Sequence, residues 1–170
     1  MYFSLFNGTK GKTVIIEPAD QSRDAFAKVK KKQKRDDLIF VHSGAWSCKK
    51  DLALYVDPTH PATNFTEGTV DYSEERIAEF DKILIPCDTV DNLVNSAGID
   101  KVDLVSITTN GAVTQVLEGM TQLMNCGIEY ICLARHDHLG DFGEIMRGYG
   151  FTEFGFDDRG TTYRRIDSNA

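Results

Sequence analysis

The sequence predicts an α/β fold in which a mostly parallel β-sheet is covered by helices on both faces. Short β-branched and apolar runs alternate along the chain with stretches in which apolar residues recur at helical spacing. The connections between them are short, which favours neighbouring parallel strands. The chain ends differently, because Phe151–Phe156 and Thr161–Arg165 are consecutive strand-like runs that predict an antiparallel pair.

The predicted buried strands are short, mostly apolar runs, and the first two end at Glu17-Pro18 and at His42-Ser43-Gly44. In chain order they are Thr13–Ile16, Leu38–Val41, Lys82–Pro86, Val102–Ile107 and Ile128–Leu133. Leu52–Val56 alternates less clearly and predicts an edge strand. The polar stretch from Asp57 to Asp81 predicts a long loop with one helical turn, and a loop of this length is usually functional or mobile.

The predicted helices fill the gaps between these strands. Asp20 is expected to cap a helix with Ala25, Phe26 and Val29 on one face, and Asp88 to cap a helix closed by Gly98. A third helix is expected over Gly111–Met124, ended by Gly127, and a last one near Asp141–Arg147.

Composition limits the classes of function. The 170 residues are expected to form a single domain, 1–170, and its 41% hydrophobic and 26% charged residues are ordinary for a soluble globular protein. The first six residues lack the basic start and long apolar stretch of a signal peptide, so the cytoplasm is the expected location. No apolar run reaches a membrane-spanning length, so no membrane association is expected. A net charge of −7 argues against nucleic acid as a partner.

Two further features favour structural over functional roles. The basic run Lys28–Arg35 lies at an expected helix end, where cations suit the dipole, so a solvated helix end is favoured over an anion-binding patch. Four scattered cysteines without a CxxC pair indicate neither disulfides nor a zinc site; they are Cys48, Cys87, Cys126 and Cys132.

Candidate binding residues follow the carboxyl ends of the predicted strands, where open α/β sheets bind ligands. Glu17 is an acid at such an end, and its two interpretations, a ribose-binding carboxylate and a helix cap, stay open. Ser43, Gly44 and Ala45 are small enough for backbone amides to approach a planar ring, and a plain tight turn fits them equally well.

The segment Thr108–Gly111 is a predicted strand-to-helix turn facing the same crevice. Helix capping by Thr109 or Asn110 is the simpler explanation of this turn. The two histidines at His136 and His138 have no third ligand at a clear spacing, so no metal site is predicted. His42 and His60 are interpreted as ordinary surface or turn residues.

The sequence resembles the FkbM family of S-adenosylmethionine (SAM) methyltransferases over nearly its whole length. The resemblance runs through Ile85–Leu93, Lys101–Ile107 and Asn110–Met120, and Val14–Pro18 resembles the second strand of the family with its acid-proline ending. Tyr2–Leu5 resembles the helix just after the glycine-rich loop of the family. The resemblance implies a Rossmann-like methyltransferase fold that lacks the first strand and that loop, and is N-terminally truncated relative to the family.

The resemblance also implies SAM as cofactor, with Glu17, Ser43, Gly44 and Ala45 as its binding residues. The acceptor would be a small molecule or sugar methylated on a hydroxyl. However, Ser106, Thr108 and Asn110 stand where the family has charged residues, which removes the expected acid/base groups. Thr108, Asn110 and His136 are therefore the weak catalytic candidates.

Two functions stay open at this point. One is a SAM-dependent O-methyltransferase; the other is a degenerate relative that acts as a binding or assembly module without catalysis. Loss of the first strand would leave sheet edges unpaired, which favours a homodimer through those edges. Weak SAM binding and little or no turnover are expected for the chain as given.

Overall fold

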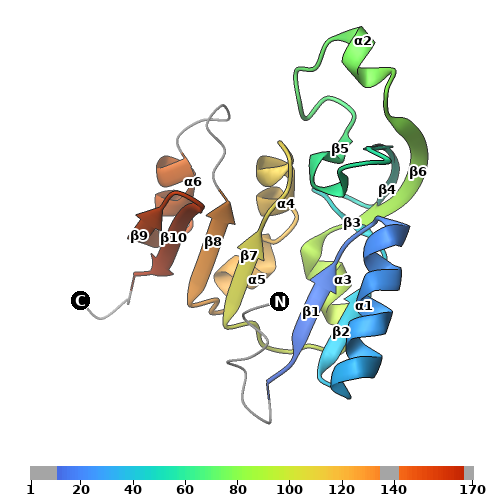
Figure 1. The fold of residues 1–170 in the computed structure, drawn as a ribbon. Coiled ribbons are helices and arrows are strands. Elements are labelled where there is room, and N and C mark those ends of the chain that lie inside the picture. Colours follow the sequence, from blue (N-terminus) through green and yellow to red (C-terminus); the bar gives the residue numbers. More distant parts are fainter. Residues whose placement is uncertain (1–10, 135–141, 167–170) are drawn as a thin grey trace.

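The computed structural model describes residues 11–134 and 142–166, and in this part of the chain the strands form three sheets (Figure 1). β1 (Thr13–Ile16) pairs in parallel with β2 (Leu38–Val41). A second sheet has the order β7 (Leu104–Ile107), β8 (Tyr130–Ala134), β10 (Gly160–Arg165), β9 (Phe151–Asp157). The third has the order β3 (Gly44–Ala45), β6 (Asp81–Asp88), β4 (Lys50–Val56), β5 (Phe65–Thr66).

The expectation of one mostly parallel sheet is wrong for the described residues. Parallel ladders join β1 with β2, β7 with β8 and β3 with β6, whereas β4 and β10 pair antiparallel with both of their neighbours. The antiparallel pairing of β9 with β10 follows from their short connection. A parallel pair needs a crossover of about a dozen residues, and the β9–β10 turn is far shorter. The predicted antiparallel C-terminal pair is confirmed.

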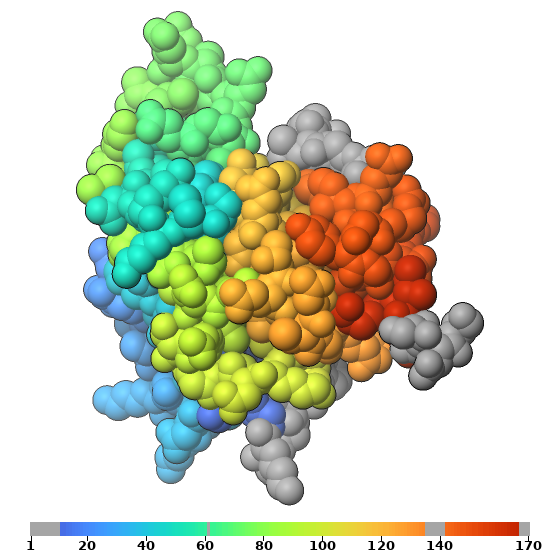
Figure 2. All heavy atoms as spheres, turned by 180° about the vertical axis from the view of Figure 1, so that it is seen from behind, coloured from blue at the N-terminus to red at the C-terminus, as the bar shows by residue number. Residues whose placement is uncertain are grey.

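The predicted edge strand is not at an edge. β4 lies inside its sheet, between β6 and β5, and pairs with β6 along its whole length from Lys50 to Val56. The expected long loop holds more structure than one helical turn: a 3₁₀ turn η2 (Pro61–Thr63), strand β5 and helix α2 (Glu74–Ile77). We call residues 57–80 the lobe, and it projects beyond the rest of the molecule in both Figure 1 and Figure 2.

The helices agree better with the sequence pattern. They are α1 (Asp20–Gln33), α3 (Val90–Ser96), α4 (Val113–Glu118), α5 (Thr121–Asn125) and α6 (Phe142–Gly148). Gly98 and Gly127 have φ angles of 69° and 102°, the left-handed conformation that glycine allows after a helix end.

Both predicted N-terminal caps are wrong. α1 is preceded by Ala19 without a side-chain cap, and Asp20 is its first residue. Thr89, not Asp88, caps α3, since its Oγ1 accepts from the Asn92 N–H at 3.1 Å. The single helix expected over Gly111–Met124 is two helices, α4 and α5. The break lies at Gly119, where an added Cβ would stand 2.0 Å from the Trp46 carbonyl oxygen.

One large core holds the second sheet to its helices. It joins α3, α4, α5 and α6 to one face of β7, β8, β10 and β9; its fully buried members are Val113, Met120, Met124, Ile131, Met146 and Phe151. Figure 2 shows these helices as a continuous surface from α3 through α4 and α5 to α6. A smaller core around Trp46, Leu54 and Ile85 holds the third sheet.

Candidate functional site

Residues at the carboxyl ends of β1, β3 and β7 belong to or pack against one apolar core. Ile16, the last residue of β1, and Ala45 of β3 both pack against the core cluster that contains Ile107, the last residue of β7. The residues that follow β1 and β7 in the sequence are Glu17 and Thr108, and we call the region of Glu17, Ser43–Ala45 and Thr108–Gly111 the candidate edge. That these segments form one binding site stays a prediction.

Of the two roles that the sequence left open for Glu17, the structural one at the start of α1 is present. The Glu17 Oε1 accepts the Ala19 N–H at 2.9 Å and so supports the start of α1, while its own N–H continues the pairing with β2 by donating to the Val41 carbonyl. Among the described residues, Oε2 takes part in no hydrogen bond or ion pair. A half-buried carboxylate with one oxygen held and one available fits the bidentate acceptor that a ribose diol requires.

Ser43 to Ala45 is neither a tight turn nor an open surface. Gly44 and Ala45 form β3, which pairs in parallel with Cys87 and Asp88 of β6. The buried Ser43 hydroxyl donates to the Pro86 carbonyl at 3.0 Å. An added Cβ on Gly44 would stand 2.4 Å from the Cys87 Sγ. The small size of Gly44 thus serves packing against Cys87 and does not fit the predicted role of lining a ring.

Hydrogen bonds hold the turn after β7, residues 108–111, against the lobe. The Asn110 Nδ2 donates to the carbonyls of Ala62 and Asn64, at 2.8 and 2.9 Å. Gly111 has a φ of 77°, and an added Cβ would stand 1.8 Å from the Thr69 carbonyl oxygen. The side-chain amide of Asn110 therefore already donates two hydrogen bonds within the protein, which argues against a catalytic role. Asn110 also does not cap α4, which has no side-chain cap.

Three other polar side chains line this turn. Thr108 is exposed and Thr109 is half-buried. The Thr109 Oγ1 and the Gln115 Oε1 are buried atoms without a hydrogen-bond partner in the described residues. This unused hydrogen-bonding capacity lies next to the candidate edge, but neither group can act as a base at neutral pH.

Asp57 anchors the lobe and was not identified from the sequence. One of its carboxylate oxygens accepts from the Thr59 N–H at 2.8 Å, the Thr59 hydroxyl at 2.7 Å and the His60 N–H at 2.9 Å. The other accepts from the Thr63 hydroxyl at 2.9 Å. These donors, Thr59 above all, hold the pKa of Asp57 well below its ordinary value. The Asp-Pro-Thr sequence at 57–59 was the available signal, since Asp before such a turn often bonds the backbone two residues on.

The histidines and cysteines give no support for metal chemistry. The His42 Nε2 lies 2.9 Å from the Pro18 carbonyl oxygen and 3.4 Å from Asp20 Oδ1, so it joins the start of α1 to the end of β2. His136 lies outside the described residues. Within residues 11–134 and 142–166 there is no group of three metal-ligating side chains. Burial raises the pKa of the Cys87 thiol to about 11, which keeps it protonated at neutral pH.

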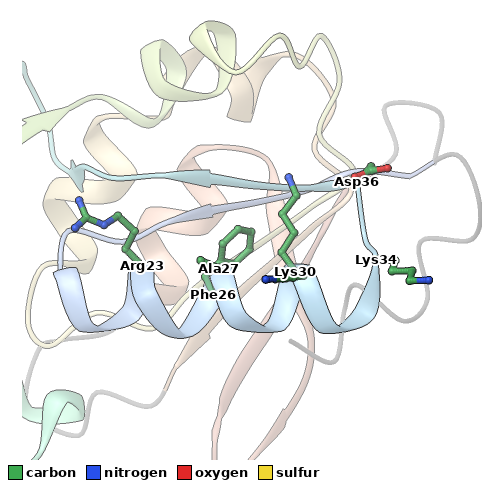
Figure 3. A pocket seen from close by; sticks show the side chains of 7 residues that line it. Arg23, Phe26, Ala27, Lys30, Lys34 and Asp36 are labelled. Carbon is green, nitrogen blue, oxygen red and sulfur yellow. The ribbon is translucent and has the colours of Figure 1, made fainter.

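A hollow of about 580 Å³ lies along α1 (Figure 3). Basic side chains surround its apolar floor of Phe26 and Ala27; the lining residues are Arg23, Lys30, Lys31, Lys34 and Asp36. The Lys30 Nζ already donates to the Leu38 carbonyl at 2.8 Å, and Arg23 lies 3.0 Å from Asp20 Oδ1. These bonds agree with the predicted solvated helix end more than with an anion site.

The chain has a mixed α/β fold that is similar to the fold of a methyltransferase of known structure. The comparison that supports this class is with the crystal structure of methyltransferase FkbM from Methylobacillus flagellatus KT, with a TM-score of 0.59. The match covers 96% of this chain at 11% sequence identity, so the likeness is one of fold. The chain spans 39% of the length of that protein.

Sequence comparisons add nothing to this structural similarity: no family model and no curated protein matches the chain. In the described part of the chain, every helix is too short or too polar to cross a membrane.

Proposed function

We propose that the chain is a SAM-dependent methyltransferase-like protein whose candidate edge receives the nucleoside end of SAM. The observation that carries the proposal is Glu17, an acid at the carboxyl end of β1 with one carboxylate oxygen engaged by Ala19 and the other available. In this arrangement the carboxylate accepts hydrogen bonds from the ribose hydroxyls. The methyltransferase-like fold supports the choice of SAM over other nucleosides.

The base of the cofactor would lie against the backbone near Ser43 and Ala45. Cys87 fills the space beside Gly44, so the ring would contact the outer side of this segment and not the Gly44 Cα. SAM itself supplies the reactive methyl group, and the residues of this chain supply binding and orientation. The proposed acceptor is a hydroxyl group of a small molecule or sugar.

A second candidate function, a binding module without catalysis, is favoured by a specific observation. Two polar groups of the candidate edge already donate hydrogen bonds within the protein. The Ser43 hydroxyl donates to the Pro86 carbonyl, and the Asn110 amide donates to the carbonyls of Ala62 and Asn64. No carboxylate, lysine or histidine among the described residues of the turn 108–111 is available to take a proton from an acceptor. We therefore expect SAM binding in about the millimolar range and little or no turnover.

Two substitutions of Glu17 test the proposal by calorimetric titration with SAM. Glu17→Ala should weaken binding by about 1–3 kcal/mol, the range for a hydrogen bond to a charged group. Glu17→Gln is the matched control for folding, because its amide oxygen can still accept the Ala19 N–H. If binding falls in both variants while the melting temperature falls only in Glu17→Ala, Glu17 contacts the ligand. Unchanged affinity in both variants would remove Glu17 from the site.

A further inference from the structure

Strand β6 has one edge that is paired along its length and one edge that is largely unpaired. β4 covers the first edge from Asp81 to Cys87. On the other edge, β3 pairs only with Cys87 and Asp88, and among the described residues no further strand joins that side. Figure 1 shows β6 along the outer margin of the molecule, beside the lobe. Residues 81–86 therefore form an open edge of the third sheet.

The backbone groups that point to this open edge belong to alternate residues. In a strand, the N–H and C=O of one residue point to the same side, and those of the next residue point to the opposite side. The Asp88 carbonyl points toward β3, since it accepts the Trp46 N–H at 2.9 Å. Lys82, Leu84 and Pro86 lie an even number of positions before Asp88. Their backbone groups therefore point to the same side, which is the open edge.

The side chains at this edge are apolar and exposed. Leu84 is 71% exposed and Ile83 is 38% exposed, although both belong to a strand held in a sheet. The nearest cation leans away from the edge. The Lys82 Nζ lies 5.3 Å from the centre of the Tyr55 ring on β4 and 3.8 Å from the Glu67 Oε1. An exposed apolar edge of this kind favours pairing with another strand.

The edges at β5 and β9 differ from the edge of β6. β5 is two residues long. β9 carries Glu153 and Asp157, and its ladder with β10 shifts register next to Thr162. Short strands, charges and register shifts are devices that prevent edge pairing. β6 is longer, and its ladder with β4 keeps one register throughout.

We infer that the open edge of β6 pairs with the same edge of a second copy of this chain, as antiparallel strands related by a two-fold axis. Pro86 fixes the register, because it has no N–H and its carbonyl already accepts the Ser43 hydroxyl at 3.0 Å. The register that avoids Pro86 places Lys82 opposite Leu84 of the second copy. Each of these residues then exchanges both of its backbone hydrogen bonds with the residue opposite.

This register makes the edge self-complementary, as a two-fold interface requires. Ile83 lies directly opposite Ile83 of the second copy, in a pair without hydrogen bonds, where side chains are closest. Asp81 lies opposite Ile85 of the second copy, so the two Asp81 carboxylates are roughly 14 Å apart and well screened. The interface is small, and we expect a weak dimer with a dissociation constant on the order of 100 μM. The sequence favoured dimerisation at edges left by a missing first strand, whereas β6 belongs to another sheet.

Sedimentation equilibrium of the full chain from about 10 μM to 1 mM tests for the dimer. The unsubstituted chain should change from monomer to dimer across this range. Leu84→Pro removes an N–H that points away from β4, so it should weaken the dimer by at least about tenfold and keep the ladder with β4. Phe156→Lys is the matched control, because Phe156 is 78% exposed on β9, and it should leave the dimer unchanged. The melting temperature of each monomer verifies folding.

Charge substitutions at Leu84 test the register. Leu84→Lys faces Lys82 of the second copy and should weaken the dimer about tenfold, whereas Leu84→Glu faces the same cation and should keep it. In a register with Leu84 opposite itself, both substitutions would bring like charges together and weaken the dimer equally. Both variants change only an exposed side chain, so they keep the test decisive if Leu84→Pro does not fold.

Cysteine cross-linking locates the two-fold axis. The background is a chain with Cys48→Ser and Cys126→Ser, which removes two exposed thiols. Ile83→Cys should form an intermolecular disulfide on oxidation with diamide, because directly opposite Cβ atoms are about 5 Å apart. Asp81→Cys should not, because the two copies of this residue are roughly 14 Å apart.

Several outcomes would overturn the inference. They are a monomer at about 1 mM, a dimer that both Leu84→Pro and Leu84→Lys leave unchanged, and cross-linking of Asp81→Cys in place of Ile83→Cys. Equal weakening by Leu84→Lys and Leu84→Glu would overturn the register. Slow hydrogen exchange of residues 81–86 in the monomer would overturn the choice of a second copy in favour of a segment of the same chain.

Discussion

The core of the second sheet and the lobe are stabilised by different interactions. The first buries a continuous set of apolar side chains between β7, β8, β10, β9 and the helices α3 to α6. In the lobe, the Phe65 ring stacks on Tyr55 of β4 at 4.8 Å and meets the Phe80 ring edge to face at 5.0 Å. The lobe also depends on single polar anchors at Asp57 and Asn110. Apolar packing is spread over many residues, whereas a polar anchor fails when one group changes. The lobe should therefore open before the core does.

The largest expected effect is in the core. Met120 is fully buried, so Met120→Ala removes packed atoms and leaves a cavity, at a cost of about 2–5 kcal/mol in the free energy of unfolding. Urea unfolding followed by circular dichroism measures this cost. Thr114→Ala, at an exposed position of α4, is the control and should change the free energy by less than about 0.5 kcal/mol. Equal costs for the two would contradict the assignment of the core.

The next largest loss of stability is expected for a substitution at Gly111, where the core meets the lobe. Gly111→Ala meets both an unfavourable φ of 77° and the Thr69 carbonyl oxygen at 1.8 Å from the new Cβ. Gly98→Ala has a similar φ of 69° and nothing within 4 Å, so it measures the backbone strain alone, about 1–2 kcal/mol. Gly111→Ala should cost about 1–3 kcal/mol more because of the overlap. If both variants melt at the same temperature, the lobe does not contact Gly111 as described.

Protonation of Asp57 at low pH should destabilise the lobe. The folded pKa of Asp57 lies below its ordinary value of 3.8, so the stabilisation is present above about pH 4 and is lost as the pH falls through the folded pKa. The exchange of amides in residues 57–80 should therefore accelerate below pH 4 after correction for the intrinsic pH dependence of exchange. Asp57→Asn should flatten this response, and an identical acid response in both proteins would assign it to another group.

The smallest effect is expected at Asn110. Asn110→Ala removes two hydrogen bonds to exposed backbone carbonyls, which should cost about 1 kcal/mol and increase exchange at residues 62–64. Thr108→Ala, two residues earlier and exposed, should leave that exchange unchanged. Faster exchange in Thr108→Ala alone would reverse the assignment of the anchor.

Local sequence patterns predicted many of the elements. The apolar runs at Thr13–Ile16 and Leu38–Val41 are strands, and the run Val102–Ile107 contains the strand Leu104–Ile107, because β-branched residues suit a buried sheet. Gly98 and Gly127 end helices because they allow a positive φ. The sequence indicated that Glu17 is either a ribose ligand or a structural group at the helix start. The structural role is present, because Glu17 accepts a hydrogen bond from the Ala19 N–H.

Features set by tertiary contacts could not be predicted in the same way. The polar composition of residues 57–80 resembles a loop, although Asp57 and the three aromatic rings of Phe65, Tyr72 and Phe80 give it a fixed shape. Gly119 divides the helix expected over Gly111–Met124 because the carbonyl of Trp46, the residue after β3, packs against it. Division into three sheets depends on which edges meet, and apolar periodicity carries no information on that pairing.

Titration of the purified chain with SAM, followed by incubation with methyl-labelled SAM and a panel of hydroxylated small molecules and sugars, tests the central claim most directly. Our account predicts an affinity in about the millimolar range that depends on Glu17, because few groups at the edge are free to hold the cofactor. It also predicts little or no labelled product, because the described turn at residues 108–111 has no base. Low-micromolar affinity or efficient formation of a methylated product would contradict it.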